Sequence, residues 1–129
     1  MITLVDSKGL VANNRGDNLP THKKYFSKLD SKVPRLTNLQ EVVEHYKPTA
    51  LLGLSTVKSA FSEDIIRFLA KTNKRPIIFA LSNPLTQAEC TFEEAIQWSD
   101  GNALFASGSP FADVNWHGKN LINNQGNNV

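Results

Sequence analysis

The feature that most constrains this chain is an unbroken apolar run over residues 77–81, which stops at Ser82, Asn83 and Pro84. A continuous apolar run of this length is typical of a strand buried on both faces, as in a parallel sheet. Polar residues directly after such a strand lie at its carboxyl end, where open α/β sheets bind their ligands. The run therefore predicts a central parallel strand with a binding edge at its end.

Other apolar segments alternate with helical patterns along the chain. The predicted strands and helices, in chain order, span residues 2–5, 39–47, 50–55, 63–72, 77–81, 91–98 and 103–106. The alternation predicts βαβ units with right-handed crossovers, and hence an α/β fold with a parallel sheet. Residues 10–37 are polar and predict a long loop, while residues 114–122 predict a hairpin that turns at His117 and Gly118.

Small polar residues follow all four predicted strands, at positions 6–7, 55–56, 82–83 and 107–109. In a parallel sheet these ends lie on one edge, so together they predict a binding site. Asp6 has two interpretations: an acid that accepts from ribose hydroxyls, or an equally common Asx-turn. The Gly-rich phosphate loop expected about 20 residues before such an acid is absent. The residues alone therefore leave nucleotide binding open.

Composition excludes several other classes. The chain has 129 residues, a net charge of +2 and no stripe of Lys and Arg with interleaved aromatics, which argues against nucleic acid as a partner. No apolar run reaches the length of a membrane span. Cys90 is the only cysteine, and no signal peptide is visible, which favours the cytoplasm or mitochondria over secretion. No constellation for nucleophilic catalysis is present, and the three histidines lack metal-ligand spacing, so we predict no catalytic residue and no metal ligand here.

Long motifs of the chain resemble the malic enzyme family. They span residues 5–10, 47–53, 76–84, 87–91, 105–111 and 126–128, and so cover essentially the whole chain in order. The resemblance implies an oxidoreductase that oxidatively decarboxylates malate to pyruvate and CO2 with NAD or NADP and with Mg or Mn, usually as a homodimer or homotetramer. It implies that residues 1–129 are the central part of the family's dinucleotide-binding domain. The expected fold is a partial Rossmann-like, doubly wound parallel sheet, truncated at both ends.

The resemblance assigns cofactor contacts near the start of the chain. Asp6 resembles the family residue at the adenine ribose, and Ser7 and Lys8 resemble the pattern of members that use NADP. Lys23 falls where such members place a lysine near the 2′-phosphate, although the loop alignment also allows Lys24. A lysine is a suitable point charge for a phosphate dianion, whereas Asp6 would repel one. The balance favours NADP over NAD.

The resemblance assigns further contacts after the later strands. Ser55 and Thr56 match the family's cofactor-contacting turn, and Asn83 matches an amide that holds malate near the nicotinamide. Asn127 or Asn128 matches a second amide that holds malate. Amides bind a carboxylate well but are poor general acids or bases. We therefore predict substrate binding, and no proton transfer, from these three positions.

The chain departs from the family pattern in residues 55–59, which contain no glycine where the family usually has a Gly-rich turn. In addition, the family's catalytic tyrosine and lysine, its metal-binding acids and its phosphate loop all lie upstream of the matched region. We therefore expect this chain to be inactive by itself, with the Mg or Mn ligands outside it. Two alternatives remain: a malolactic-type enzyme, and a degenerate family member that binds only a nucleotide or a partner subunit.

Overall fold

The computed structural model describes residues 1–27 and 33–126. The chain divides into two compact units, Met1–Tyr46 and Lys47–Val129, and each is described by itself. Asn127 and Asn128, which we expected to hold malate, lie outside the described residues.

The first unit begins with a small hairpin. Strand β1 (Val5–Asp6) pairs antiparallel with β2 (Gly9–Leu10), and neither strand belongs to the parallel sheet of the chain. The prediction of a buried parallel strand over residues 2–5 is therefore wrong, and Ile2 is 67% exposed. The reason is local, because closing the short turn between β1 and β2 costs little entropy compared with pairing to a distant segment.

The long loop predicted over residues 10–37 is only partly correct. It contains the 3-10 helix η1 (Asn13–Arg15) and the helix α1 (Thr21–Phe26). No residue of α1 is buried, so the helix lacks the apolar stripe from which it could have been predicted. Its first turn is instead set by Pro20, whose carbonyl accepts hydrogen bonds from the backbone N–H groups of Lys23 and Lys24.

Helix α2 (Leu39–Tyr46) closes the first unit as predicted. The backbone N–H of Glu41 donates to Asn38 Oδ1 at 2.9 Å, which satisfies one free donor at the start of the helix. Val42 of α2 packs with Leu10 and Ala12 in a small core. The apolar face of α2 therefore anchors the β1–β2 hairpin.

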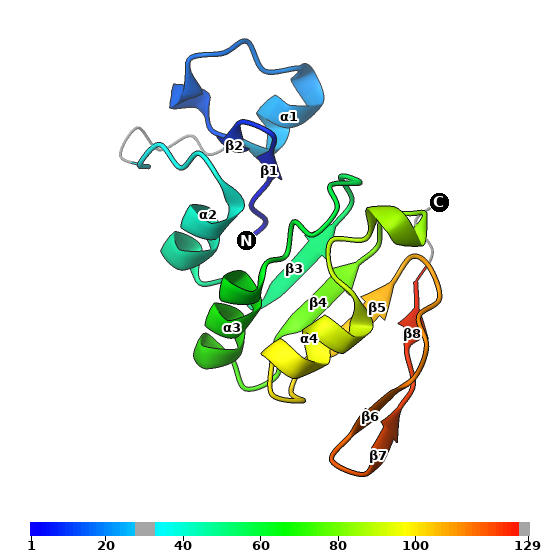
Figure 1. Cartoon of the computed structure of the whole chain (residues 1–129). Helices are drawn as coiled ribbons and strands as arrows, with labels where there is room; N and C mark the ends of the chain where they lie inside the picture. Colours follow the sequence, from blue (N-terminus) through cyan, green and yellow to red (C-terminus); the bar gives the residue numbers. More distant parts are fainter. Residues whose placement is uncertain (28–32, 127–129) are drawn as a thin grey trace. The chain divides into compact units, whose positions relative to one another are not determined.

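The second unit is a four-stranded parallel sheet in the order β3-β4-β5-β8 (Figure 1). Its strands span Ala50–Gly53 (β3), Ile77–Ala80 (β4), Leu104–Ser107 (β5) and Asn124–Gln125 (β8). Helices α3 (Glu63–Thr72) and α4 (Phe92–Trp98) pack against each other on one side of it, and the 3-10 helix η2 (Leu85–Gln87) precedes α4. This confirms the predicted α/β fold with a parallel sheet.

The two sides of the sheet differ in burial. The side chains that share a face with Ile78 and Ala80 are buried in β3, β4 and β5, whereas Leu52 and Leu104 on the opposite face are 57% and 42% exposed. The prediction that the strand at residues 77–81 is buried on both faces is thus correct for one face only. Helices α3 and α4 cover that one face.

The helix starts follow the sequence signals. Ser62 Oγ accepts a hydrogen bond from the N–H of Ile65 at the start of α3, and Thr91 and Glu94 form a complete capping box at the start of α4. These contacts involve residues three positions apart. They are local enough to be predicted without the fold.

The end of the unit contains one predicted and one unpredicted element. Strands β6 (Val114–Trp116) and β7 (Lys119–Leu121) form the predicted hairpin, with φ of 48° at His117 and 82° at Gly118, the positive values of a type I′ turn. Strand β8 was not predicted, because its Asn-rich sequence is typical of disorder. It forms because Asn124 and Gln125 pair with the edge of β5.

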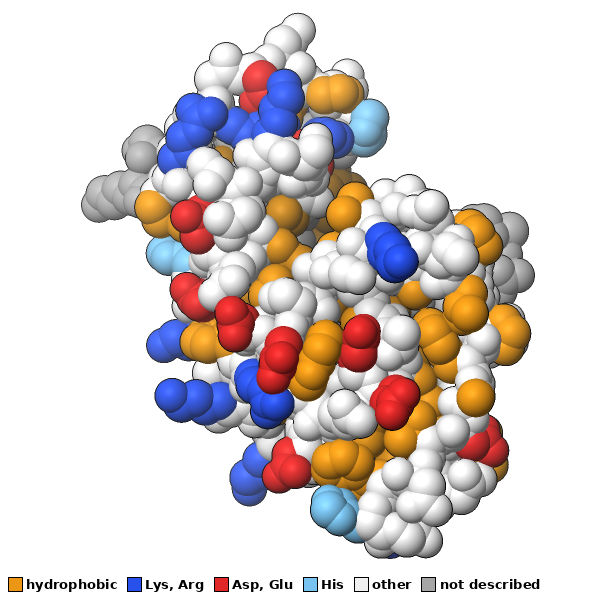
Figure 2. Space-filling view, viewed as in Figure 1, with side chains coloured by type: hydrophobic (Ala, Val, Ile, Leu, Met, Phe, Trp, Pro, Cys, Tyr) orange, Lys and Arg blue, Asp and Glu red, His pale blue; other side chains and the backbone are white. Residues whose placement is uncertain are grey.

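The surface of the second unit carries charges of both signs. In Figure 2, acidic and basic side chains lie together over helix α3, whereas the charged side chains of α4 are acidic, and no continuous stripe of Lys and Arg crosses the two helices. Of the helices in residues 1–27 and 33–126, none has the length and hydropathy needed to span a bilayer.

Candidate functional site

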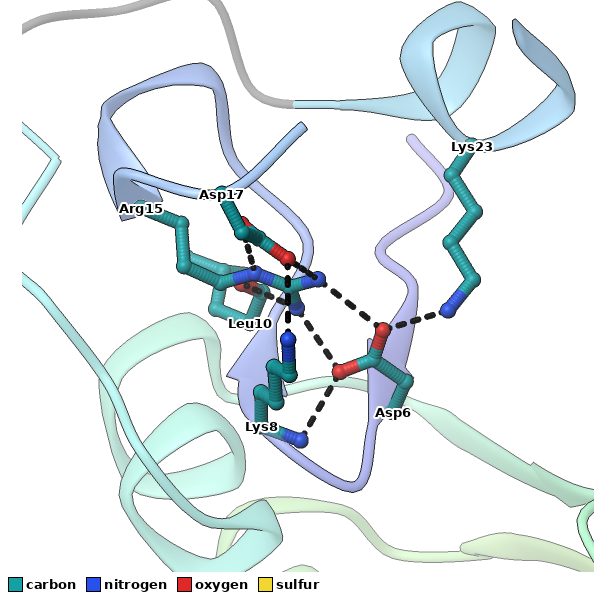
Figure 3. Close-up of polar contacts among 6 residues, drawn as sticks. All are labelled: Asp6, Lys8, Leu10, Arg15, Asp17 and Lys23. Atoms are coloured by element: carbon teal, nitrogen blue, oxygen red, sulfur yellow. Dashed lines mark hydrogen bonds and ion pairs between the residues drawn. The ribbon is translucent and has the colours of Figure 1, made fainter. Parts of the chain in front are cut away.

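The side chain of Asp6 is the centre of an ionic cluster in the first unit (Figure 3). Arg15 Nη1 and Nη2 donate to the two carboxylate oxygens of Asp6 at 2.7 and 3.1 Å. Lys23 Nζ, from α1, donates to Asp6 Oδ2 at 2.5 Å. Asp17 holds Arg15 from the other side, accepting from Nε and Nη2 at 2.8 Å each. Two carboxylates thus fix one guanidinium in a bidentate fork on either side.

The cluster has more positive than negative charge. It contains three basic side chains, of Lys8, Arg15 and Lys23, and two carboxylates, of Asp6 and Asp17. The Arg15 side chain is only 5% exposed, so its charge is held at a fixed position. The result is a net cationic site around the acid that the resemblance places at the adenine ribose.

The protonation state of Asp6 is set by this cluster. Partial burial alone would raise the pKa of Asp6, but the hydrogen bonds from Arg15 and Lys23 outweigh that effect and hold the pKa well below its usual value. Hydrogen bonds from Arg15 lower the pKa of Asp17 to about 2. Both carboxylates are therefore ionised at neutral pH.

All the acceptor sites of Asp6 are in use. Oδ1 accepts from Arg15 and from the backbone N–H of Lys8 at 2.9 Å, while Oδ2 accepts from Arg15 and Lys23. A carboxylate offers about four lone-pair sites, so a ribose hydroxyl must displace one of these donors. Lys23, whose side chain is 31% exposed, is better placed to leave than Arg15. The bond from Lys8 also makes Asp6 the Asx-turn that was the alternative interpretation.

The other residues in and beside the cluster differ in whether the sequence predicted them as site residues. Ser7 and Lys8 form the exposed turn between β1 and β2, as a contact to a cofactor would require. Arg15 and Asp17 were missed, because they lie in a polar stretch with no periodic pattern. Only folding brings Arg15 back to Asp6, nine positions earlier in the chain.

The second unit brings together the ends of β3, β4 and β5. The N–H of Thr56, after β3, donates to Ser82 Oγ, after β4, at 2.9 Å. Ser109 Oγ, after β5, donates to Asn83 Oδ1 at 2.6 Å. The predicted shared edge therefore exists for these three strands. The end of the first predicted strand, at Asp6, belongs to the first unit and is not part of the parallel sheet.

The turn after β3 has an unusual backbone. Thr56 and Ser59 both have φ of 58°, in the left-handed region that favours glycine, and the turn is the segment that lacks glycine. Ser55, Thr56 and Lys58 are exposed. Two residues of the turn thus adopt backbone angles that favour glycine, and the turn carries exposed polar side chains.

Metal binding and thiol chemistry find no support in the described parts of the chain. In residues 1–27 and 33–126, no three His, Cys, Asp or Glu side chains gather in a way that could hold a metal ion, so Mg or Mn does not fit there. Burial, with Glu94 and Glu89 nearby, raises the pKa of the Cys90 thiol well above its usual range. Cys90 is therefore a packing residue.

A dinucleotide fits the described residues better than a metal does. The cationic excess around Asp6 is suited to a phosphate-bearing ribose, and the exposed polar turn at Ser55 and Thr56 lies at the carboxyl edge of a parallel sheet. Asn83, at the end of β4, is exposed and carries an amide suited to a carboxylate.

Comparison with known proteins gives the family. The family model described as the malic enzyme NAD-binding domain matches residues 1–129. The chain is 50% identical over 125 residues to an NADP-dependent malic enzyme of Dictyostelium discoideum, covering 97% of this chain and 23% of that protein. It is 46% identical over 128 residues to the mitochondrial NAD-dependent malic enzyme of Ascaris suum, covering 99% of this chain and 19% of that protein.

The relatives leave two finer points open. They include NADP- and NAD-dependent enzymes, and chloroplastic as well as mitochondrial forms, so they select neither a cofactor nor a compartment. The chain spans about a fifth of the length of the curated relatives it matches. On the family match and the parallel sheet together, the chain belongs to the malic enzyme family, within the region of its NAD-binding domain.

Proposed function

We propose that this chain supplies the NADP-binding part of an enzyme that oxidatively decarboxylates malate to pyruvate and CO2. The observation that carries the NADP preference is the contact between Lys23 and Asp6. Residues 1–129 then correspond to the central part of the dinucleotide-binding domain. The parent enzyme would be a homodimer or homotetramer in the cytoplasm or mitochondria, with Mg or Mn bound by residues outside this chain.

The cofactor preference follows from the charges around Asp6. A lone carboxylate would repel a 2′-phosphate, but Arg15 neutralises this one and stays in place because Asp17 holds it. When NADP binds, Lys23 moves from Asp6 to the 2′-phosphate, and the oxygen it leaves accepts the remaining ribose hydroxyl. Lys8, on the adjacent turn, adds a second cation.

The residues of the second unit bind and orient. Ser55 and Thr56 contact the cofactor, and NADP when bound would accept the hydride from malate. Asn83 holds the malate carboxylate beside the nicotinamide, together with Asn127 or Asn128. None of these side chains transfers a proton at neutral pH. The chain by itself therefore binds cofactor without turning over malate.

The cofactor assignment is tested by calorimetric titration of the chain with NADP and with NAD. We expect NADP to bind more tightly, and Lys23→Gln to weaken NADP binding about tenfold or more through loss of a charge-assisted hydrogen bond. NAD binding should not weaken, because without Lys23 a ribose hydroxyl no longer has to displace a lysine from Asp6. The matched control is Lys24→Gln, which removes the same charge from the neighbouring, exposed position. Tighter binding of NAD than of NADP would end the NADP preference, and an effect of Lys24→Gln alone would transfer the role to Lys24.

The absence of turnover is tested by adding the chain to malate, NADP and Mn and following the absorbance of the reduced cofactor. We expect no rate above a blank without protein. A measurable rate would contradict the assignment of the catalytic and metal-binding groups to other parts of the enzyme.

A second candidate is a degenerate family member that has lost catalysis. The turn at residues 55–59 favours it, because Thr56 and Ser59 adopt left-handed backbone without glycine and place side chains at the cofactor edge. Such a member would bind a nucleotide or a partner subunit, so this candidate predicts that the parent protein shows no turnover of malate with NADP and Mn even where the cofactor binds. A malolactic-type enzyme would bind the cofactor in the same way and differ only in forming lactate.

A further inference from the structure

We propose that Ser82 and Glu89 are positioning residues that hold the turn at residues 55–59 in the shape in which Ser55 and Thr56 meet the cofactor. This inference rests on the proposed function, because it adds two residues to the same cofactor edge. Ser82 was predicted only as one of the polar residues at the strand ends, Glu89 was not predicted as part of the site, and both are only 1% exposed.

The backbone conformation of the turn at residues 55–59 requires support from the surrounding structure. Thr56 and Ser59 have φ of 58°, a conformation that is strained for residues with a Cβ and most of all for a β-branched residue such as Thr56. Strained backbone persists only where the surrounding structure over-determines it. The turn is otherwise exposed from Leu54 to Ser59, so its own side chains provide little packing.

The holding contacts come from the segment after β4. The N–H of Thr56 donates to Ser82 Oγ at 2.9 Å, and the Ser82 hydroxyl donates to Glu89 Oε1. The backbone N–H of Ser59 donates to the carbonyl of Ala88 at 3.1 Å. The N–H of Phe61 donates to the carbonyl of Glu89 at 3.0 Å. Residues 82–89 therefore hold the strained turn by hydrogen bonds that they accept from backbone N–H groups within the turn and just after it.

Glu89 acts through Ser82. A serine hydroxyl has one proton and can rotate, so it can accept from Thr56 in a fixed direction only if its own proton is committed elsewhere. Glu89 Oε1 accepts a hydrogen bond from that hydroxyl proton. The chain of bonds from Thr56 N–H to Ser82 Oγ to Glu89 thereby sets the orientation of the hydroxyl, and a buried chain of this kind strengthens each of its bonds.

The end of strand β3 leaves space for the Glu89 side chain. A Cβ at position 53 would lie 2.3 Å from Glu89 Cδ, so Gly53 at the end of β3 admits the carboxyl group. Glu89 Oε2 is buried and has no hydrogen-bond partner among the described residues, and none of their ion pairs includes this side chain. Packing alone does not explain a buried acid with one unsatisfied oxygen, since an apolar side chain would fill the space at lower cost. Orienting the Ser82 hydroxyl gives the buried Glu89 carboxylate a function.

The test compares Ser82→Ala, Glu89→Leu, Glu89→Gln and Glu93→Gln in the whole chain by two measurements. One is the Kd for NADP, and the other is the rate of tryptic cleavage after Lys58, which lies in the exposed turn. Glu89→Gln keeps an acceptor oxygen for the Ser82 hydroxyl and serves as the conservative variant. Glu93→Gln makes the same change at an exposed position of α4 and serves as the matched control.

We expect Ser82→Ala to raise both the Kd for NADP and the cleavage rate, each by up to about tenfold, because the turn loses one buried hydrogen bond. Glu89→Leu, which removes the acceptor of the Ser82 hydroxyl, should raise both in the same direction, whereas Glu89→Gln and Glu93→Gln should leave both close to wild type. A Kd in Glu89→Leu equal to that of wild type would show that Glu89 does not act through Ser82. Thermal melting checks that each variant is folded. If Ser82→Ala does not melt cooperatively, Ser82→Cys replaces it, since it is close in size but a poor hydrogen-bond partner.

The outcomes separate the inference from the proposed function. If the wild-type chain binds NADP and the serine variant leaves its Kd unchanged, this inference is wrong, even if cleavage after Lys58 is faster. If the wild-type chain binds neither NADP nor NAD, the proposed function is wrong, and faster cleavage in the serine variant would still show that Ser82 holds the turn.

Discussion

Replacement of Arg15 by alanine tests whether the ionic cluster stabilises the first unit. The Arg15 side chain is 5% exposed and the Asp6 side chain 19% exposed, and two N–H···O bonds of 2.7 and 3.1 Å join them. Removing one partner of a fully buried ion pair costs about 3–5 kcal/mol, whereas an exposed pair contributes less than about 1 kcal/mol. Because Asp6 keeps some contact with water and with Lys23, we expect Arg15→Ala to cost about 2–3 kcal/mol.

Hydrogen exchange at single amides measures this loss where it occurs. The backbone N–H groups of Leu10 and Val11 donate to the carbonyls of Leu36 and Leu4 at 2.8 and 3.0 Å, so they report the opening of the first unit around the hairpin. A cost of about 2–3 kcal/mol corresponds to exchange about 30- to 150-fold faster at both amides. The control is Arg67→Ala, which breaks the i,i+4 pair with Glu63, whose side chains are 55% and 51% exposed.

The control should lower the free energy of opening of α3, as measured by amide exchange, by less than about 1 kcal/mol, because exposed ion pairs contribute little to stability. If Arg15→Ala accelerates exchange at Leu10 and Val11 no more than Arg67→Ala does in α3, the cluster does not stabilise the hairpin. The reasoning that Arg15 keeps Asp6 neutralised for a phosphate would then lose its structural basis.

Three further predictions concern packing, acid and the thiol. Gly53→Ala should lower stability by about 1–3 kcal/mol, measured by thermal melting, because the new Cβ would collide with Glu89; an unchanged melting temperature would show that the acid can move aside. Since the folded pKa values of Asp6 and Asp17 lie below the ordinary 3.8, their contribution to stability is complete above that pH and decreases as the pH falls towards about 2. Unfolding free energies measured across this range should therefore fall on acidification, and less steeply in Asp17→Asn; equal slopes would contradict the assignment. Cys90 should react with a thiol reagent only after unfolding, because burial raises its pKa, and rapid reaction of the native chain would refute its burial.

Much of the second unit could be predicted from local sequence. The starts of α3 and α4 depend on contacts between residues three positions apart, at Ser62 and at Thr91, so a short window contains the whole signal. The hairpin at His117 and Gly118 is set by its turn in the same way. The parallel order of the sheet followed from the alternation of strands and helices, which requires crossover connections.

The errors concern which segment each strand or side chain takes as its partner. Residues 2–5 have an apolar sequence suited to a buried strand, yet the hairpin at Val5 and Asp6 uses only the next few residues as a partner. β8 was missed for the opposite reason, because an Asn-rich segment gains its partner only when β5 is already in place. Arg15 gave no signal, since a single arginine in a polar stretch acquires a role only from the side chains that folding brings to it.

The sequence by itself determined the fold class, the family and the residue types at each candidate site, since periodicity, caps and long motifs are properties of short segments. Tertiary structure alone decided which of these residues work together. It separated Asp6 from the parallel sheet, surrounded it with Arg15 and Lys23, and joined the strand end at Ser82 to the buried Glu89. The reason is physical: hydrogen bonds and ion pairs act only over a few ångströms, and the distance between residues far apart in sequence is set by the fold.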